Sequence, residues 1–117
     1  MLGTVSQVFG ILDDLKIPSA QFMWDSDDEK PSLPYVILVA QQSNNLHTDG
    51  SVAFEAQRYD LELYSKTRDI PLEKRVKAAL RQARIDYDTD YAVDEKGQVV
   101  ITYFHVTLIE QEANNGN

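Results

Sequence analysis

Polar and apolar residues alternate strictly in the second half of the stretch Ala53–Lys66, AFEAQRYDLELYSK. A period of two places successive side chains on opposite faces of a strand, so this pattern predicts a long, half-buried β-strand. The run exceeds the usual strand length of about 5–6 residues, which predicts a bulge or a strand that outgrows the body of the fold. The two expected faces are Gln57, Tyr59, Leu61 and Leu63 on one side, and Arg58, Asp60, Glu62 and Tyr64 on the other.

Other segments also have strand-like patterns. A continuously apolar run, Tyr35–Ala40, indicates a strand buried on both faces, which we expect at the centre of the sheet. Val99–Glu110 is the expected partner of the long strand, with Phe104 facing the core and His105 half-exposed. Shorter strands are expected at Ala20–Trp24 and Ile85–Val93.

The segment Ile85–Val93 carries aspartates at alternate positions, so in a strand all of them point to the same side. We expect a hairpin turn after it, over Asp94–Gly97, with Gly97 supplying the left-handed residue. The spacing D-x-D-x-D also opens calcium-binding loops, but Tyr91 stands where such a loop needs glycine, and the closing glutamate is missing. We therefore reject a calcium site. The alternating acids are Asp86, Asp88 and Asp90.

Apolar residues recur at helical spacing near the N-terminus and again after the long strand. Thr4 is expected to cap the first helix in a capping box with Gln7, and this helix should end near Lys16. Asp69 is the expected N-cap of the second helix, with Glu73 in the first turn, where a carboxylate suits the helix dipole. The apolar positions are Val5, Val8, Phe9, Leu12 and Leu15 in the first helix, and Leu72, Val76, Ala79, Leu80 and Ala83 in the second.

The second helix is also predicted to carry a basic side. At about 100° per residue, its Lys and Arg residues lie roughly opposite the apolar stripe. This side is either an ordinary solvated surface or a contact with an acidic neighbour, such as another copy of the chain. Its residues are Lys74, Lys77, Arg81 and Arg84.

The order of these elements is α-β-β-β-α-β-β. It predicts an α+β fold, a mostly antiparallel sheet of four to five strands with two helices packed on one face. The length of 117 residues predicts a single domain over residues 1–117. The polar tail, residues 111–117, is expected to fray.

Composition excludes several classes of function. The chain has no cysteine, so disulfides and thiolate chemistry are ruled out, and we expect neither a secretory signal nor a membrane span. Its net charge is −8, whereas proteins that bind nucleic acid usually have a basic balance. The charge is uneven, because seven of the 11 basic residues lie between Lys66 and Arg84. Such asymmetry suits either simple solubility or a surface that meets other surfaces in one orientation.

We find no catalytic constellation. A phosphate-binding glycine loop, a zinc ligand set and a nucleophile elbow are all missing from the sequence. Paired carboxylates are interpreted as residues of polar loops, where nothing raises a pKa, and the acidic loop Asp25–Ser32 lacks the glycine and glutamate of a calcium site. We therefore expect no enzymatic activity, cofactor or metal.

The chain resembles the tail terminator, or tail completion, proteins of long-tailed bacteriophages. The likeness covers Val5 to Glu110, and its most specific part is the block Tyr59–Lys66 followed by a charged helix that contains Glu73. The N-terminal helix before a short strand, the Pro34–Val36 start of the apolar strand, the polar loop around Asn45 and Asp49, and the aromatic strand Tyr103–Ile109 also fit.

The resemblance implies a structural role in the virion, in a protein made in the host cytoplasm. Such proteins form a hexameric ring on the head-proximal end of the tail tube, stop tube growth and dock to the neck protein. We expect DNA to pass through the ring without specific binding, and we take the three aspartates Asp86, Asp88 and Asp90 as channel-facing candidates. The subunit-interface candidates are Asn45, Leu46, His47 and Asp49 in the polar loop, and Lys74, Lys77, Arg81 and Arg84.

Two alternatives remain open at this stage. The nearest competitor is another neck component, a head-closure or stopper protein. A monomeric ligand-binding or regulatory domain is the competitor from another class. The mass of the protein in solution and the identity of the partner that it captures distinguish the terminator, the stopper and the monomeric domain.

Overall fold

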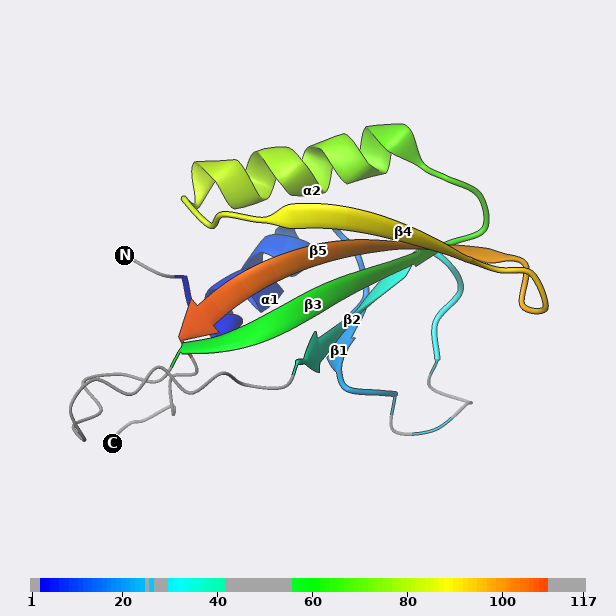
Figure 1. Cartoon of the computed structure of the whole chain (residues 1–117), viewed down its shortest axis with the longest axis horizontal. Coiled ribbons are helices and arrows are strands. Elements are labelled where there is room, and N and C mark those ends of the chain that lie inside the picture. Colours follow the sequence, from blue (N-terminus) through cyan, green and yellow to red (C-terminus); the bar gives the residue numbers. More distant parts are fainter. Residues whose placement is uncertain (1–2, 25, 27–29, 42–55, 110–117) are drawn as a thin grey trace.

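The structure is a computed structural model that describes residues 3–24, 26, 30–41 and 56–109. The strands form one five-stranded sheet in the order β1-β2-β3-β5-β4, antiparallel except for the parallel pair β1–β2 (Figure 1). This confirms the predicted α+β class and element order. The elements are α1 (Val5–Asp14), β1 (Ser19–Gln21), β2 (Tyr35–Ala40), β3 (Ala56–Ser65), α2 (Ile70–Gln82), β4 (Asp88–Asp94) and β5 (Val99–Ile109).

Both helices pack on the same face of the sheet and enclose the core. In Figure 1, α1 lies behind the strands and α2 runs along β4. Because alternate residues of a strand point to the same face, β3 and β5 each contribute every second side chain to this core. The core includes Val8 and Leu12 of α1, Leu72, Val76 and Leu80 of α2, Tyr59, Leu61 and Leu63 of β3, and Phe104, Val106 and Leu108 of β5.

The long strand has a regular partner. β3 pairs with β5 without interruption from Ala56 opposite Ile109 to Ser65 opposite Val100, so no bulge interrupts the described part. The centre of the sheet is β3, whereas the apolar strand β2 lies one place from the edge. β2 is nevertheless buried over Tyr35–Leu38, because β1 covers its outer edge and the Trp24 ring packs edge-on against Tyr35 on the face away from the helices.

Both helices begin and end with recognisable caps. Thr4 and Gln7 form the predicted capping box, and Asp69 accepts from the Leu72 amide as the predicted N-cap. Each helix ends in a Schellman motif with a left-handed residue just beyond the C-cap, Lys16 at φ 61° and Arg84 at φ 61°. Arg84 therefore lies outside α2, and its predicted place on the basic side of the helix was wrong.

Two predicted strand boundaries need correction. The segment Ile85–Val93 is extended only from Asp88, because the Schellman motif turns Ile85 into the core. β1 covers Ser19–Gln21 rather than Ala20–Trp24, since Phe22 takes a left-handed conformation at φ 70°.

The hairpin turn between β4 and β5 also differs from the prediction. Its left-handed residue is Gln98, at φ 53°, and not Gly97. Gly97 serves a different purpose, because its amide donates to Oδ1 of Asp94 and a Cβ there would lie 2.9 Å from Oδ2 of the same side chain. Close approach, rather than positive φ, therefore explains the glycine.

Candidate functional site

The face of the sheet turned away from the helices carries most of the charged residues of the strands. Cross-strand partners share a face, so two rows run across β3, β5 and β4. One row is Asp60, His105 and Asp88, and the next is Glu62, Tyr103 and Asp90. We call the carboxylates of these rows, Asp60, Glu62, Asp88 and Asp90, the acidic face.

Several side chains of this face are held in place by their neighbours. The Nδ1–H of His105 donates to Oδ1 of Asp60, 2.5 Å away, and Asp60 is only 8% exposed. The rings of Tyr103 and His105 stack with an interplanar angle of 3°. The hydroxyl of Tyr64 donates to Oε1 of Glu62 at 2.9 Å. The amide of Tyr91 donates to Oδ1 of Asp90 at 2.8 Å, so three of the four carboxylates are oriented by hydrogen bonds.

The carboxylates affect the tyrosines among them. Burial, and then the charges of Glu62, Asp60 and Asp90, raise the pKa of Tyr103 above its ordinary value. Burial and the hydrogen bond to Glu62 raise the pKa of Tyr64 as well. A phenol stays protonated when ionisation would add a second negative charge beside a carboxylate. The strand register places Glu62 and Asp90 on either side of Tyr103, which accounts for the direction of its shift.

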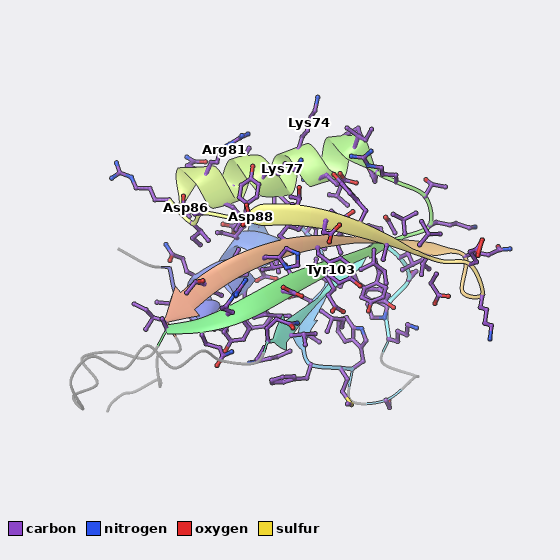
Figure 2. All side chains as sticks on the ribbon, viewed as in Figure 1. Lys74, Lys77, Arg81, Asp86, Asp88 and Tyr103 are labelled. Atoms are coloured by element: carbon purple, nitrogen blue, oxygen red, sulfur yellow. The ribbon has the colours of Figure 1, made fainter. Side chains whose placement is uncertain are left out.

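The outer side of α2 has the opposite charge. Lys74 and Arg81 are exposed and Lys77 is half-buried. Figure 2 shows Lys74 and Arg81 extending from the side of α2 turned away from the sheet. Arg75 is directed elsewhere, toward the carbonyl of Leu15 at the end of α1. We call Lys74, Lys77 and Arg81 the basic side of α2.

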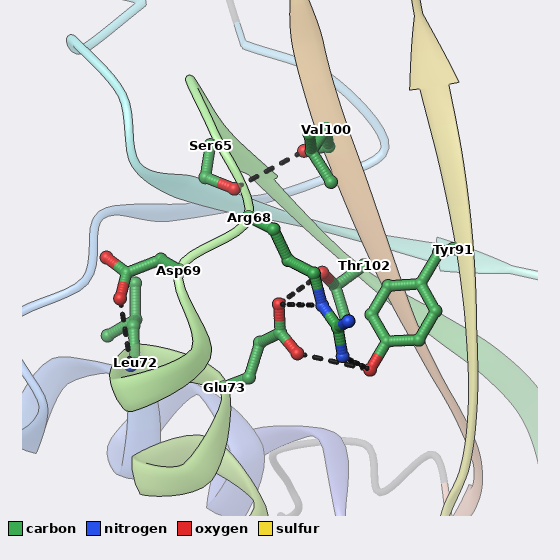
Figure 3. Close-up of polar contacts among 8 residues, drawn as sticks. All are labelled: Ser65, Arg68, Asp69, Leu72, Glu73, Tyr91, Val100 and Thr102. Carbon is green, nitrogen blue, oxygen red and sulfur yellow. Dashed lines mark hydrogen bonds and ion pairs between the residues drawn. The ribbon is translucent and has the colours of Figure 1, made fainter.

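The only carboxylate of α2, Glu73, is buried beneath the helix with 1% exposure (Figure 3). Its oxygens accept from the hydroxyls of Tyr91 at 3.1 Å and Thr102 at 3.2 Å, and Arg68 lies 3.5 Å away. The Arg68 guanidinium also stacks on the Tyr91 ring, 4.3 Å from its centre. Glu73 therefore ties α2 to β4 and β5 and leaves the outer side of the helix purely basic.

An open groove of about 1060 Å³ runs along the end of β5 that β4 does not reach. Gly3 and Gln7 form its wall on the α1 side, and Ala83 and Ile85 line it after α2. Its charged residues and its histidine are Arg58, Arg84, Asp86, Asp88 and His105.

The structure brings together only some of the residues singled out from the sequence. Asp88 and Asp90 lie on one side of β4, whereas Asp86 precedes the strand and lines the groove with Arg84. Lys74, Lys77 and Arg81 share the basic side of α2. The loop candidates Asn45, Leu46, His47 and Asp49 lie outside the described residues. The channel-facing and subunit-interface roles stay predictions.

Sequence reasoning missed two polar pairings. It placed Asp60 and Glu62 on the long strand and Glu73 in the second helix, as the structure does, but it assigned no partner to Asp60 or Glu73. Helical spacing held a signal for Glu73, because Val76 and Leu80 follow it at three and seven positions, on the buried stripe. The pairing of Asp60 with His105 depends on strand register, which the pattern alone does not specify.

Comparison with protein-family models finds no match to this chain. A search of the curated proteins likewise finds no match. The family resemblance therefore rests on the residues of the chain itself. Neither helix in the described part of the chain is long and apolar enough to cross a membrane.

Proposed function

We propose that this protein is a structural assembly protein that acts as a phage tail terminator. It forms a ring at the head-proximal end of the tail tube, stops the growth of the tube and presents a face to the neck protein. The proposal joins the family resemblance to a physical feature of the molecule. A ring subunit needs different surfaces toward its two neighbours, because a heterologous contact never joins a patch to its own copy.

One observation carries the proposal: both edges of the sheet expose large apolar side chains. Phe22 and Met23 follow the edge strand β1, with Met23 72% exposed, and Val93 of the other edge strand, β4, is 67% exposed. Single exposed apolar residues are common, but an adjacent pair at one edge and a further residue at the opposite edge suit contacts with other chains.

The test is to add the purified protein to growing tail tubes and measure tube length by electron microscopy. We expect short tubes with a ring at one end. The variant Met23→Ser/Val93→Ser should cap poorly, and Lys96→Glu, in the hairpin turn, should cap like the wild type. Tubes that grow without limit, with no bound protein, would contradict a terminator. Capture of the connector instead of the tube protein would assign the chain to the stopper class.

The groove beside β5 favours a second candidate function, that of a monomeric ligand-binding or regulatory domain. Its size and its mixed charges suit a small polar ligand, as a monomeric binding domain requires. Ligand-induced changes in the amide spectra of Arg84 and His105, in a chain that stays monomeric and never caps tubes, would favour that function.

A further inference from the structure

We infer that copies of this protein bind one another through the basic side of α2 on one copy and the acidic face of the sheet on the next. This inference rests on the proposed function and names the two surfaces that close the ring. The partner that binds the helix-free face of the sheet is therefore a second copy of this chain.

The two surfaces have opposite and nearly unmixed charge. Glu73, the only carboxylate within α2, is buried, so the helix itself exposes no negative charge, and the exposed Asp86 lies beyond the helix end, where it lines a hollow with Arg81. Arg58 is the only lysine or arginine in β3, β4 and β5, the three strands that cross the acidic face. Opposite potentials on two patches steer them together and disfavour the contact of each patch with its own copy.

The spacing of the charges also matches. Lys74 and Arg81 are seven residues apart in α2, which corresponds to roughly 10 Å along the helix axis. Glu62 on β3 and Asp90 on β4 both lie opposite Tyr103 of β5, which places the two strands about 10 Å apart. A helix lying across the strands can therefore place a cation near the carboxylates of both β3 and β4.

The acidic face is preorganised for such a contact. Asp60 is held by His105 and Glu62 by Tyr64, so these carboxylates lose little side-chain freedom when a cation arrives. The basic side of α2 cannot reach the acidic face of its own chain, because the sheet lies between them. The contact must join two copies, and it is heterologous.

The experiment measures self-association by sedimentation and native mass spectrometry in four forms of the full chain. The helix variant is Lys74→Glu/Lys77→Glu/Arg81→Glu, and the sheet variant is Asp88→Lys/Asp90→Lys. We expect each to associate roughly 10- to 100-fold more weakly than the wild type, because attraction becomes repulsion at several exposed pairs. The control Lys66→Glu/Lys96→Glu, with cations reversed away from α2, should associate like the wild type.

Restoring complementarity provides the decisive measurement. An equimolar mixture of the helix and sheet variants should associate as the wild type does, because every contact then joins opposite charges. A chain that carries all five reversals should also assemble on its own. Thermal unfolding of each variant confirms that the fold is retained.

Other outcomes overturn the inference. If the helix variant associates as strongly as the wild type, this pair of surfaces is excluded. The pair is also excluded if the mixture of the helix and sheet variants does not regain wild-type association. A wild-type chain that stays monomeric at every soluble concentration excludes it too, although the proposed function survives if that chain still caps tubes. A sheet variant that forms normal rings but hinders DNA passage would assign Asp88 and Asp90 to the channel, as the sequence analysis expected, and not to the contact.

Discussion

Glu73 shows how one buried carboxylate joins three elements of the fold. It accepts from hydroxyls on β4 and β5 and pairs with Arg68, while its own backbone belongs to the first turn of α2. A buried charge is stable only when its oxygens are satisfied in this way, and its partners lose their acceptor when it is removed.

We expect Glu73→Ala to lower the free energy of unfolding by about 2–4 kcal/mol, since Thr102 is then left buried without its acceptor. Urea unfolding at neutral pH measures this change. Glu95→Ala, at an exposed position of the hairpin turn, is the matched control and should stay within about 0.5 kcal/mol of the wild type. Equal stability of Glu73→Ala and the control would mean that the buried contacts do not form in solution.

The helix rules predicted where Glu73 sits but not what it touches. A carboxylate in the first turn is favoured by the helix dipole whether or not it is buried. Its burial arises because β4 and β5, which follow in the sequence, bring Tyr91 and Thr102 beneath the helix. Contacts between residues 18 and 29 positions apart depend on tertiary packing, which local patterns do not encode.

The tyrosines of the acidic face make the stability sensitive to alkaline pH. Below the ordinary tyrosine pKa near 10, Tyr64 and Tyr103 are protonated in both the folded and the unfolded chain, so they add no pH dependence. Above it the unfolded chain releases these protons first, because folding raises both pKa values. The free energy of unfolding should therefore fall as the pH rises past this value.

Urea unfolding between about pH 8 and about pH 11 tests this expectation. The double variant Tyr64→Phe/Tyr103→Phe should have a shallower decline than the wild type. Glu62→Gln should also be shallower, because it removes a charge that raises both pKa values. Parallel declines in all three proteins would contradict the assignment of the effect to this face.

At the scale of elements, the helix ends place unusual residues in the left-handed region. Lys16 occupies a position that glycine usually fills, at φ 61°. We expect Lys16→Gly to raise the free energy of unfolding by about 0.5–1 kcal/mol, because the strain of the side chain is relieved. Lys77→Gly in the middle of α2 should instead lower it by about 1 kcal/mol, and thermal unfolding of both variants measures the contrast. A loss of stability in both would show that Lys16 is not strained.

The same helix ends explain where the sequence analysis succeeded and where it failed. Side-chain caps are local, so Thr4, Gln7 and Asp69 identified both helix starts. Schellman ends with lysine or arginine in the place of glycine carry no such signal, and Arg84 was therefore read as part of the helix. The error propagated to β4, whose start was set at Ile85 instead of Asp88.

At the scale of the whole molecule, one apolar layer between the sheet and the helices holds the fold together. Leu61 lies at the centre of that layer on the middle strand and is 1% exposed. We expect Leu61→Asp to unfold the chain, because a buried unpaired charge costs several kcal/mol. Arg58→Asp, at an exposed position of the same strand, should keep the fold, and far-UV circular dichroism distinguishes the two. A folded Leu61→Asp chain would mean that the core repacks around this position.

At the surface of the whole molecule, charged contacts and apolar contacts are both available for assembly, and salt affects the two kinds differently. Contacts between the basic side of α2 and the acidic face should weaken as NaCl rises from about 0.05 M to about 1 M, since the Debye length falls to about 3 Å. Contacts through Phe22, Met23 and Val93 should not weaken, because salt does not screen apolar burial. We therefore expect oligomers to dissociate in high salt while the thermal unfolding midpoint of the chain changes little. Sedimentation across the salt series measures this, and association that strengthens with salt would place the subunit contact at the apolar sheet edges.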